Sequence, residues 1–352
     1  MTTQHTFLRR VVWLSATVRA GKRGLVWVRK ASAPELWREF EHTKQWLADR
    51  FYENVTRFFG LLVCFLFVGL LSALIWGALP ALKHFGWRFF TRAEWDPVKL
   101  HFGALIPIYG TLVTSSVACL VAIPASFGIA LFFTELCPTW LKQPLGIAVE
   151  LLAAIPSIIY GMWGLFVLGP FMATYVYPWL QNHLGGIPAV GALFQGPPTG
   201  VGTLTGGLIL GIMIIPFMSS ILKDALEMVP RLLKESAYGL GATTWEVVWC
   251  ISLRYARIGV FGGILLGLGR ALGETMAVTF VMGNAHSLSA SLLMPGNTIA
   301  SVLANEFTEA VGEIYTSSLI ALGLVLFFIT FAVLSLAKLL LYRLSLREER
   351  TH

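Results

Sequence analysis

Six apolar segments, each long enough to cross a lipid bilayer, constrain the fold of this chain more than any other feature. A helix needs about 20 apolar residues to span the hydrocarbon core. Only 13% of the residues are charged, whereas a soluble domain carries about 25%. The sequence therefore predicts an all-α membrane protein with six transmembrane helices. The predicted spans lie near residues 59–82, 106–133, 146–170, 203–222, 258–282 and 314–341.

The positions of the lysines and arginines predict how these spans are oriented. Loops on the cytoplasmic side of a membrane protein carry an excess of Lys and Arg. With a cytoplasmic N-terminus, 21 of these residues fall on the cytoplasmic side and 4 on the other side, and without the N-terminal tail the ratio is still 10 to 4. We therefore expect a multi-pass protein with both termini in the cytoplasm.

The composition also argues against several other classes of function. The net charge of +7 does not indicate nucleic acid binding, because the charges gather at the ends of the apolar segments rather than along a groove. The four cysteines lack the spacing of a metal or redox motif, and the seven histidines are isolated from one another. The N-terminus also lacks the apolar core and cleavage site of a signal peptide. We expect no metal, no cofactor, no nucleic acid partner and no cleaved leader.

The first 58 residues form a separate element in the sequence. Ser32-Ala33-Pro34-Glu35 has the pattern of a helix cap, and apolar residues then recur at helical spacing. Upstream, basic residues alternate with Trp13 and Trp27, which favours a helix lying on anionic membrane lipid. A solvated tail is the alternative. The predicted parts are a cytoplasmic amphipathic extension (1–58), a six-helix membrane domain (59–345) and a cytoplasmic tail (346–352).

The longest internal loop predicted on the cytoplasmic side, residues 223–257, has a pattern of its own. Its centre reads PRLLKESAYGLGATTWEVVWCISLR (230–254), which predicts two short helices separated by a break at Gly239 and Gly241. An apolar patch follows on a segment that should face water, which is typical of a partner site. Anchoring of the tryptophans at the membrane interface is the alternative. The patch consists of Trp245, Val248, Trp249 and Ile251.

This loop resembles the signature of ABC-importer permease subunits, which reads E-A-A, three residues, G, nine residues, I-x-L-P. Glu235, Ala237 and Gly241 hold matching positions, Ser236 replaces an alanine, and Arg254 removes the proline that follows the second short helix in the family. The resemblance implies a coupling helix that seats in a cleft of an ATP-hydrolysing subunit. No G-x-x-x-x-G-K-[ST] phosphate loop occurs in the sequence. ATP and Mg²⁺ are therefore expected on a separate partner subunit.

Arg270 and Glu274 place two charges in the middle of the fifth predicted span. The 11 Leu, Ile, Val and Phe residues of 258–282 favour insertion by roughly 3–7 kcal/mol, and a central arginine costs about 2.5–3.5 kcal/mol. The side that bears the charges should therefore not face lipid. On one continuous helix they lie about 40° apart and about 6 Å along the axis. Their predicted shared face reads Gly263, Gly267, Arg270, Gly273, Glu274, Ala277 and Val281.

The two charges predict a path for an anion. Arginine presents a planar fork of donors that matches phosphate oxygens, and it keeps its charge. Glu274 can hold the arginine in place and compete with the anion, so that binding stays weak enough for release. The alternative is a self-neutralising ion pair, although Arg before Glu is the weaker order at this spacing. Gly259, Gly263 and Gly267 are four apart and predict close approach of another helix.

Four stretches resemble the C-type permease subunits of bacterial phosphate-specific ABC importers. The similarity runs from about residue 59 to the end. It implies the type I ABC-importer permease fold in the bacterial inner membrane, and it implies that Arg270 and Glu274 are required for transport. It also implies an A-type permease subunit, a dimer of ATPase subunits and a periplasmic phosphate-binding protein as partners. The stretches are SFGIALFFTELCPTWLKQPLGIA (126–148), ELLAAIPSIIYGMWGLF (150–166), GLGRALGETMAVTFVMGN (267–284) and MPGNTIASVLANEF (294–307).

Three alternatives remain open from the residues. A permease for another oxyanion, such as molybdate or sulfate, fits the same pattern because the binding protein usually sets that choice. An ion-coupled secondary transporter could use Arg270 and Glu274 as a proton relay, but the coupling-loop signature argues against it. A membrane-embedded enzyme would need a nucleophile–base pair or a metal constellation, and the sequence shows neither.

Overall fold

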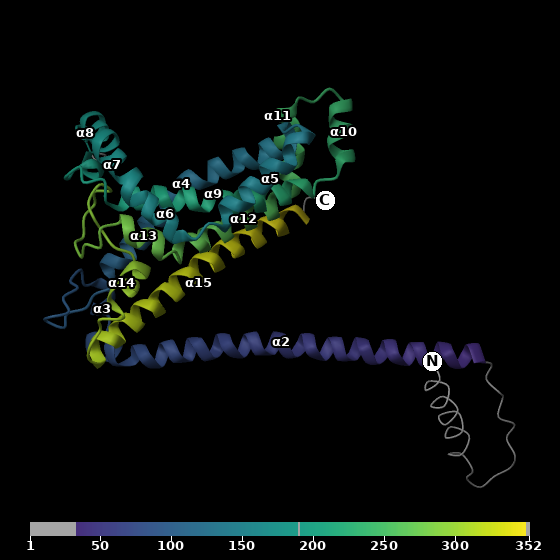
Figure 1. Ribbon diagram of the computed structural model, residues 1–352, viewed down its shortest axis with the longest axis horizontal. Coiled ribbons are helices and arrows are strands. Elements are labelled where there is room, and N and C mark those ends of the chain that lie inside the picture. Colours follow the sequence, from purple (N-terminus) through teal and green to yellow (C-terminus); the bar gives the residue numbers. More distant parts are fainter. Residues whose placement is uncertain (1–32, 189–190, 350–352) are drawn as a thin grey trace, which may run out of the picture. The chain divides into compact units, whose positions relative to one another are not determined.

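The computed structural model describes residues 33–188 and 191–349 (Figure 1). The chain divides into two compact units, residues 1–67 and 68–352. Helix α2 (Ala33–Phe85) is continuous over 53 residues, and the boundary between the two units lies within it. The predicted boundary between residues 58 and 59 also lies inside α2, so the division there stays a prediction. Ser32 of the predicted cap and the basic, Trp-containing segment before it lie outside the described residues.

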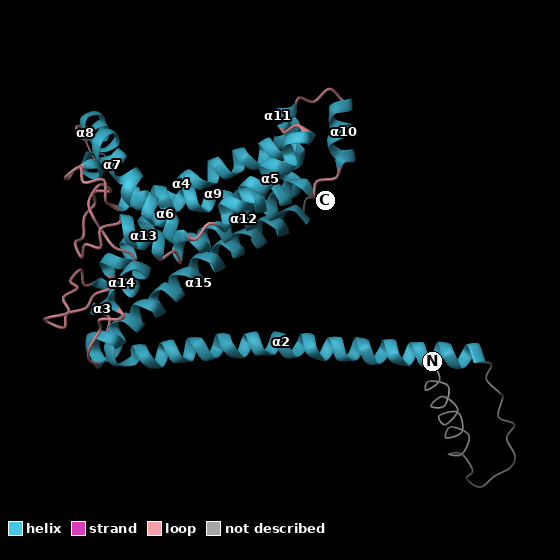
Figure 2. Cartoon of the chain, viewed as in Figure 1, coloured by secondary structure: helices cyan, strands magenta, loops and turns pink. Residues whose placement is uncertain are grey.

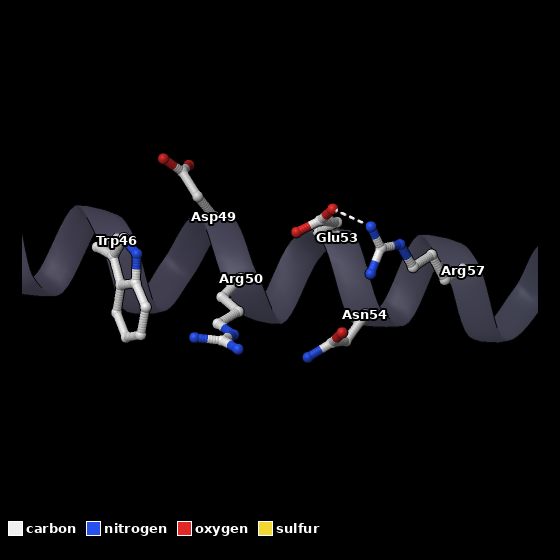
Figure 3. A pocket seen from close by; sticks show the side chains of 6 residues that line it. All are labelled: Trp46, Asp49, Arg50, Glu53, Asn54 and Arg57. Carbon is white, nitrogen blue, oxygen red and sulfur yellow. Dashed lines mark hydrogen bonds and ion pairs between the residues drawn. The ribbon is translucent and has the colours of Figure 1, made fainter.

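The first part of α2 carries a group of polar side chains between Trp46 and Arg57. Six of them line a pocket of about 410 Å³ (Figure 3). The guanidinium carbon of Arg50 lies 4.9 Å from the centre of the Trp46 ring, and Arg57 Nη2 lies 2.5 Å from Glu53 Oε1. A spacing of four residues brings both pairs together on one helical face. All six side chains are exposed, so this surface is the solvated face of the helix. Exposed pairs of this kind contribute little to stability.

The regular secondary structure of the second unit, in its described residues, is helical apart from two isolated β-bridges, and loops connect the helices (Figure 2). Short π-helical turns continue several helices, and they are η1 (Phe132–Leu136), η2 (Gly164–Leu168), η3 (Met172–Val176) and η5 (Val247–Ser252). The first helices after α2 are α3 (Arg88–Thr91), α4 (Leu105–Leu131), α5 (Thr139–Ala154), α6 (Ser157–Trp163), α7 (Gly169–Phe171) and α8 (Tyr177–Leu184). The remaining helices are α9 (Thr203–Glu227), α10 (Arg231–Gly239), α11 (Thr244–Glu246), α12 (Leu253–Leu272), α13 (Met276–Val281), α14 (Ile299–Glu306) and α15 (Glu313–Glu349).

Six helical stretches of the described residues are long and apolar enough to cross a membrane, which confirms the predicted number. The third was placed wrongly, because the prediction of 146–170 spans a break at Ile155 and Pro156. Ile155 is extended, with ψ of 130°, as expected for a residue that precedes proline. α5 is therefore separate, and the third stretch continues to Leu184, beyond the predicted end at residue 170. The six stretches are Ala48–Phe85, Leu105–Leu136, Ser157–Leu184, Thr203–Glu227, Thr244–Leu272 and Glu313–Arg343.

The fifth predicted span, 258–282, is also wrong as a single helix. α12 ends at Leu272, Gly273 follows with φ of −95° and ψ of 0°, and α13 begins only at Met276. Glycine has little helix propensity, so Gly273 is a natural place for the break. At its other end this span begins at Thr244. The second short helix of the loop therefore runs through η5 into α12 without the break that a proline in place of Arg254 would favour.

α9 is the central helix of the second unit, and it packs against both α4 and α12. The glycines of α12 allow this close approach, as predicted. A Cβ added at Gly259 would lie 2.7 Å from Ala225 Cβ of α9, and one added at Gly267 would lie 2.2 Å from Met218 Cε. α9 contributes more buried side chains to the apolar core cluster around it than any other helix, and they include Ile209, Leu210, Met213, Ile214, Met218, Leu222 and Leu226.

The short helices and loops that connect the long helices of the second unit gather at its two ends. Figure 1 shows α10 and α11 at one end, and α3 and α8 at the other. A second apolar cluster, which includes Phe89, Phe102, Ile299 and Leu319, packs the segments around α3, α14 and the first part of α15. The arrangement matches a membrane protein whose loops face two sides, and the assignment of the α10 end to the cytoplasm stays a prediction.

Candidate functional site

Arg270 lies in the last turn of α12 and is partly buried. Its guanidinium carbon lies 5.0 Å from the centre of the Phe217 ring, which belongs to α9. A cation over an aromatic face is attracted by the ring quadrupole, and the C-terminal end of a helix attracts positive charge. Two features of the fold therefore hold the arginine at the break.

Glu274 lies in the break itself, between α12 and α13. Its Oε1 accepts a hydrogen bond from the backbone N–H of Ala277 over 3.4 Å, a long and weak contact. A carboxylate at the N-terminal end of a helix is also stabilised by the helix dipole. The break thus places the negative charge at the start of one helix and the positive charge at the end of another.

The predicted shared face does not form, because the helix is interrupted between the two charges. Gly263 and Gly267 are buried against α9, and Ala277 and Val281 are buried in the core. Among the ion pairs of the described residues, none joins Arg270 to Glu274. The structure brings the two residues to the same break, while each side chain has its own partner. The alternative of a self-neutralising pair is not what this conformation shows.

Arg270 also lines a groove of about 760 Å³ between α12 and α15. Lys338 and Tyr342 of α15 belong to the same groove, together with Thr330. Nothing in the sequence links α15 to α12, so no sequence pattern predicted these three residues at the site. The other lining residues are apolar or glycine, and they are Ile258, Gly262, Leu265, Leu266, Gly269, Leu334 and Leu341.

The coupling loop has the predicted form of a short helix, a glycine turn and a second helix. Ala237 of α10 is buried, with 8% of its surface exposed, whereas Glu235 is exposed. Gly241 forms the turn with φ of +88°, a left-handed conformation that L side chains rarely adopt. Thr243 then caps α11 in a capping box, since its Oγ1 accepts from the backbone N–H of Glu246 and its own backbone N–H donates to Glu246 Oε2 over 2.7 Å. Of the three signature residues, Glu235 is therefore exposed, Ala237 is packed in the protein, and Gly241 provides the conformation of the turn.

The apolar patch predicted on this loop is only half exposed. The rings of Trp245 and Trp249 lie 5.2 Å apart and are exposed by 68% and 44%. Val248 is buried and Ile251 packs against the core, which corrects the prediction for these two residues. Their segment belongs to the membrane helix that η5 continues, so its inner face is covered. Leu232 and Leu240, exposed by 72% and 91%, extend the exposed surface instead.

Two ion pairs beside the coupling loop had no signal in the sequence. Lys234 of α10 contacts Glu135 of η1, which is 99 residues away. Lys142 of α5 contacts Glu227 at the end of α9 over 2.7 Å. Pairs so distant in sequence depend on how the helices pack, so only the tertiary structure reveals them.

A polar cluster at the opposite end of the unit surrounds Glu306 of α14. Its carboxylate accepts hydrogen bonds from Trp95 Nε1 (2.7 Å) and from the Tyr315 hydroxyl (2.8 Å), and it lies 3.0 Å from His286 Nε2. Burial acts to raise the pKa of Glu306, but the hydrogen bonds from His286, Tyr315 and Trp95 outweigh it and hold the pKa below its ordinary value. The cluster ties three other segments to α14, and no pattern in the sequence predicted it.

Comparison with known proteins identifies the family. Residues 122–346 match the model of the binding-protein-dependent transport system inner membrane component. The phosphate transport system permease protein PstC of Mesorhizobium japonicum is 56% identical over 301 residues, which cover 86% of this chain and 92% of that protein. PstC of Xylella fastidiosa (strain 9a5c) is 57% identical over 83% of this chain and 92% of its own length. PstC of Pasteurella multocida is 51% identical over 86% of this chain and 95% of its own length.

A solved structure supports the fold. A chain from the crystal structure of a bacterial alginate ABC transporter, in complex with an alginate pentasaccharide-bound periplasmic protein, superimposes with a TM-score of 0.53 at 19% identity. The match covers 86% of this chain and 95% of that one. At such low identity the likeness concerns the fold alone, and it confirms the predicted ABC-importer permease fold. Together with the family match and the PstC relatives, it shows that the chain belongs to the binding-protein-dependent transport system inner membrane components, as a PstC-type permease.

Proposed function

We propose that this chain is the transmembrane permease subunit of an ATP-driven importer of inorganic phosphate and forms half of the translocation pathway. One observation carries the proposal: PstC phosphate permeases are 50–57% identical to this chain over 83–86% of its length. The chain is a multi-pass inner membrane protein and a transporter subunit, not an enzyme. As in other members of the family, ATP hydrolysis belongs to separate subunits.

The proposed partners follow from the same family. A second permease subunit, ATPase subunits and a substrate-binding protein are general to such importers. Here they would be an A-type permease, an ATPase dimer that carries ATP and Mg²⁺, and a periplasmic phosphate-binding protein. We place both termini of the chain in the cytoplasm, which is supported by the excess of Lys and Arg around α10 and in the N-terminal segment.

The groove along α12 and α15 is the proposed wall of the anion pathway. It is lined mainly by apolar residues, and Arg270 lies in it close to the break in the fifth span. A desolvated phosphate needs a donor fork on its path, which a guanidinium supplies. Glu274, in the same break, repels the anion and keeps the binding weak enough for release. The second permease subunit would close the open side of the groove.

The coupling loop is the proposed docking element for the ATPase. Glu235 is exposed on α10, and Leu240 and Trp245 beyond it are exposed apolar side chains. Exposed apolar residues beside a charged helix are typical of a protein-binding surface. Ala237 and Gly241 support this surface from behind, through packing and through the left-handed turn.

The proposal is tested with the complete complex reconstituted in liposomes. ATP inside the proteoliposomes, where the ATPase is accessible, should drive uptake of radiolabelled phosphate in the presence of the binding protein. The alternative of another oxyanion is tested with molybdate and sulfate in the same assay. If either is taken up more strongly than phosphate, that oxyanion is the substrate. Uptake that needs a proton gradient but no ATP would support a secondary transporter and contradict the proposal.

A further inference from the structure

A buried ion pair joins the coupling loop to a membrane helix that is far away in sequence. Lys234 Nζ of α10 lies 2.5 Å from Glu135 Oε1 of η1, the π-helical turn that continues α4. The two side chains are only 16% and 8% exposed. Charged side chains are rarely so buried unless they are paired, and removal of one partner leaves the other charge without compensation. The contact therefore fixes α10 to the end of α4.

α10 is attached to its other neighbours by the chain itself. Val229 and Pro230 connect it directly to α9, and the turn at Gly241 connects it to α11 and on to α12. Ala237 is buried where α10 packs against η5. α4, by contrast, is not a chain neighbour of α10. A displacement of α10 reaches α9 and α12 through covalent connections, whereas the ion pair provides a direct connection to α4.

The other end of α4 is tied to the opposite side of the second unit. Thr111 Oγ1, near the start of α4, accepts a hydrogen bond from the backbone N–H of Ile299 over 3.0 Å, and Ile299 begins α14. At Gly110 the helix touches the segment before α14, because an added Cβ would lie 1.8 Å from the Asn297 carbonyl oxygen. With 27 residues α4 is about 40 Å long. One helix thus links the coupling loop with the polar cluster around α14.

We propose that Glu135 and Lys234 are positioning residues that transmit the ATP-driven movement of α10 to α4, and through α4 to the α14 end of the protein. The proposal rests on the proposed function, in which a separate ATPase docks on α10. Packed helices and ion pairs can carry such coupling when they connect two arrangements of the protein. The pair then acts on how closely hydrolysis is linked to transport, and not on the docking surface, which other residues form.

The test uses the full complex with its partner permease, ATPase and binding protein in liposomes. Lys234→Met and Glu135→Gln should still retain the ATPase through purification and should still hydrolyse ATP. We expect the number of ATP molecules hydrolysed per phosphate taken up to rise about tenfold in each variant. The double variant with Glu135→Lys and Lys234→Glu should bring this ratio back to within about threefold of wild type, because it restores the pair with opposite polarity.

The ion pair between Lys142 and Glu227 provides a matched control. It joins α5 to α9 near the same loop over 2.7 Å, but both side chains are 38% exposed. Lys142→Met and Glu227→Gln should leave the ratio within about twofold of wild type, as expected for an exposed pair. An equal rise in these variants would show that any lost charge near the loop uncouples the complex, and it would overturn the specific role of Glu135 and Lys234.

Two further outcomes overturn the proposal. One is an unchanged ratio in Lys234→Met and Glu135→Gln, which would mean that movement does not pass through the pair. The other is loss of the assembled complex in both variants, while Lys234→Arg and Glu135→Asp assemble stably and couple hydrolysis to transport as the wild type does. The pair would then be purely structural.

A measurement without phosphate separates this inference from the proposed function. Spin labels at Val98→Cys and Tyr175→Cys report a distance at the end opposite to α10, and both native side chains are exposed, by 92% and 66%. The four native cysteines are replaced by alanine. ATP should change this distance in the otherwise wild-type complex and not in Lys234→Met. If the complex takes up no phosphate but the distance still responds to ATP through the pair, the substrate is wrong and the inference stands.

Discussion

The guanidinium of Arg270 lies over the ring of Phe217, 5.0 Å from its centre, and the Glu274 carboxylate accepts its hydrogen bond from Ala277 instead of binding the arginine. The break between α12 and α13 separates the two charges and gives each the end of a different helix. Because Arg270 is not paired with the Glu274 carboxylate, its N–H donors are available to bind a transported oxyanion. This relationship favours a role in transport over a structural ion pair.

Replacement of Arg270 by glutamine should abolish phosphate uptake while the ATPase still copurifies. A hydrogen bond to a charged group is worth about 1.5–3 kcal/mol, so loss of a two-donor fork should lower uptake by about 100-fold or more. Lys338→Gln, in the same groove, is the control and should retain most of the activity. Normal uptake by Arg270→Gln would mean that Arg270 has a structural role. Equal losses in both variants would point to the total charge of the groove.

Glu274→Gln should also abolish uptake, for a different reason. The amide oxygen can still accept the hydrogen bond of Ala277, but the negative charge that favours release of the anion is lost. The assembled complex should therefore keep its stability and retain phosphate longer, which rapid filtration of preloaded proteoliposomes measures. Glu274→Asp keeps the charge and should recover part of the uptake. Unchanged uptake by Glu274→Gln would argue against any competition with the anion.

Gly241→Val should weaken docking of the ATPase. A β-branched residue forced to φ of +88° is strained by about 1–2 kcal/mol or more, so the turn after α10 would rearrange. Gly239→Ala is the matched control, since Gly239 ends α10 and an added Cβ meets no atom within 4 Å. Copurification of the ATPase at matched expression is the measurement. Wild-type recovery with Gly241→Val would contradict the proposed role of the turn.

Gly259→Val should destabilise the helix packing at the centre of the protein. Even a Cβ at this position would lie 2.7 Å from Ala225 Cβ of α9, and overpacking of a well-packed core costs about 1–3 kcal/mol. Gly262→Val is three residues further along α12, where an added Cβ meets nothing within 4 Å. The melting temperature in detergent should fall for the first variant and change little for the second. Equal melting temperatures would mean that α9 and α12 are less closely packed.

The stability of the α14 end should depend on pH through Glu306. Its pKa is lower in the folded protein than the ordinary value of 4.5, so the carboxylate stabilises the fold at any pH above the unfolded pKa. That contribution is lost as the pH falls from this ordinary value through the lower pKa of the folded protein. Glu306→Gln should unfold at lower temperature near neutral pH, and the difference from wild type should shrink below pH of about 4. Glu309→Gln, whose native side chain is exposed, is the control and should melt at the wild-type temperature near neutral pH.

The number of spans, the signature of the coupling loop and the two charges within the fifth span were predictable because each depends on local properties. Whether a run of apolar residues is long enough to cross a bilayer does not depend on the rest of the fold. Gly241 occupies its turn because glycine can adopt the left-handed conformation there. The third span was predicted wrongly because its apolar run continues through Ile155, which Pro156 holds out of the helical conformation. The fifth span was predicted wrongly because the apolar run also continues through Gly273, where α12 ends.

The sequence by itself determined the fold class, the family and the residues that are candidates for transport. Only the tertiary structure decided what those residues contact: Arg270 meets Phe217 of α9, Lys234 meets Glu135 of η1, and Glu306 collects donors from three segments. The physical reason is that helix formation and membrane insertion depend on short stretches of chain. Contacts between side chains that are distant in sequence depend on how the helices pack against one another, and local sequence patterns do not predict that packing.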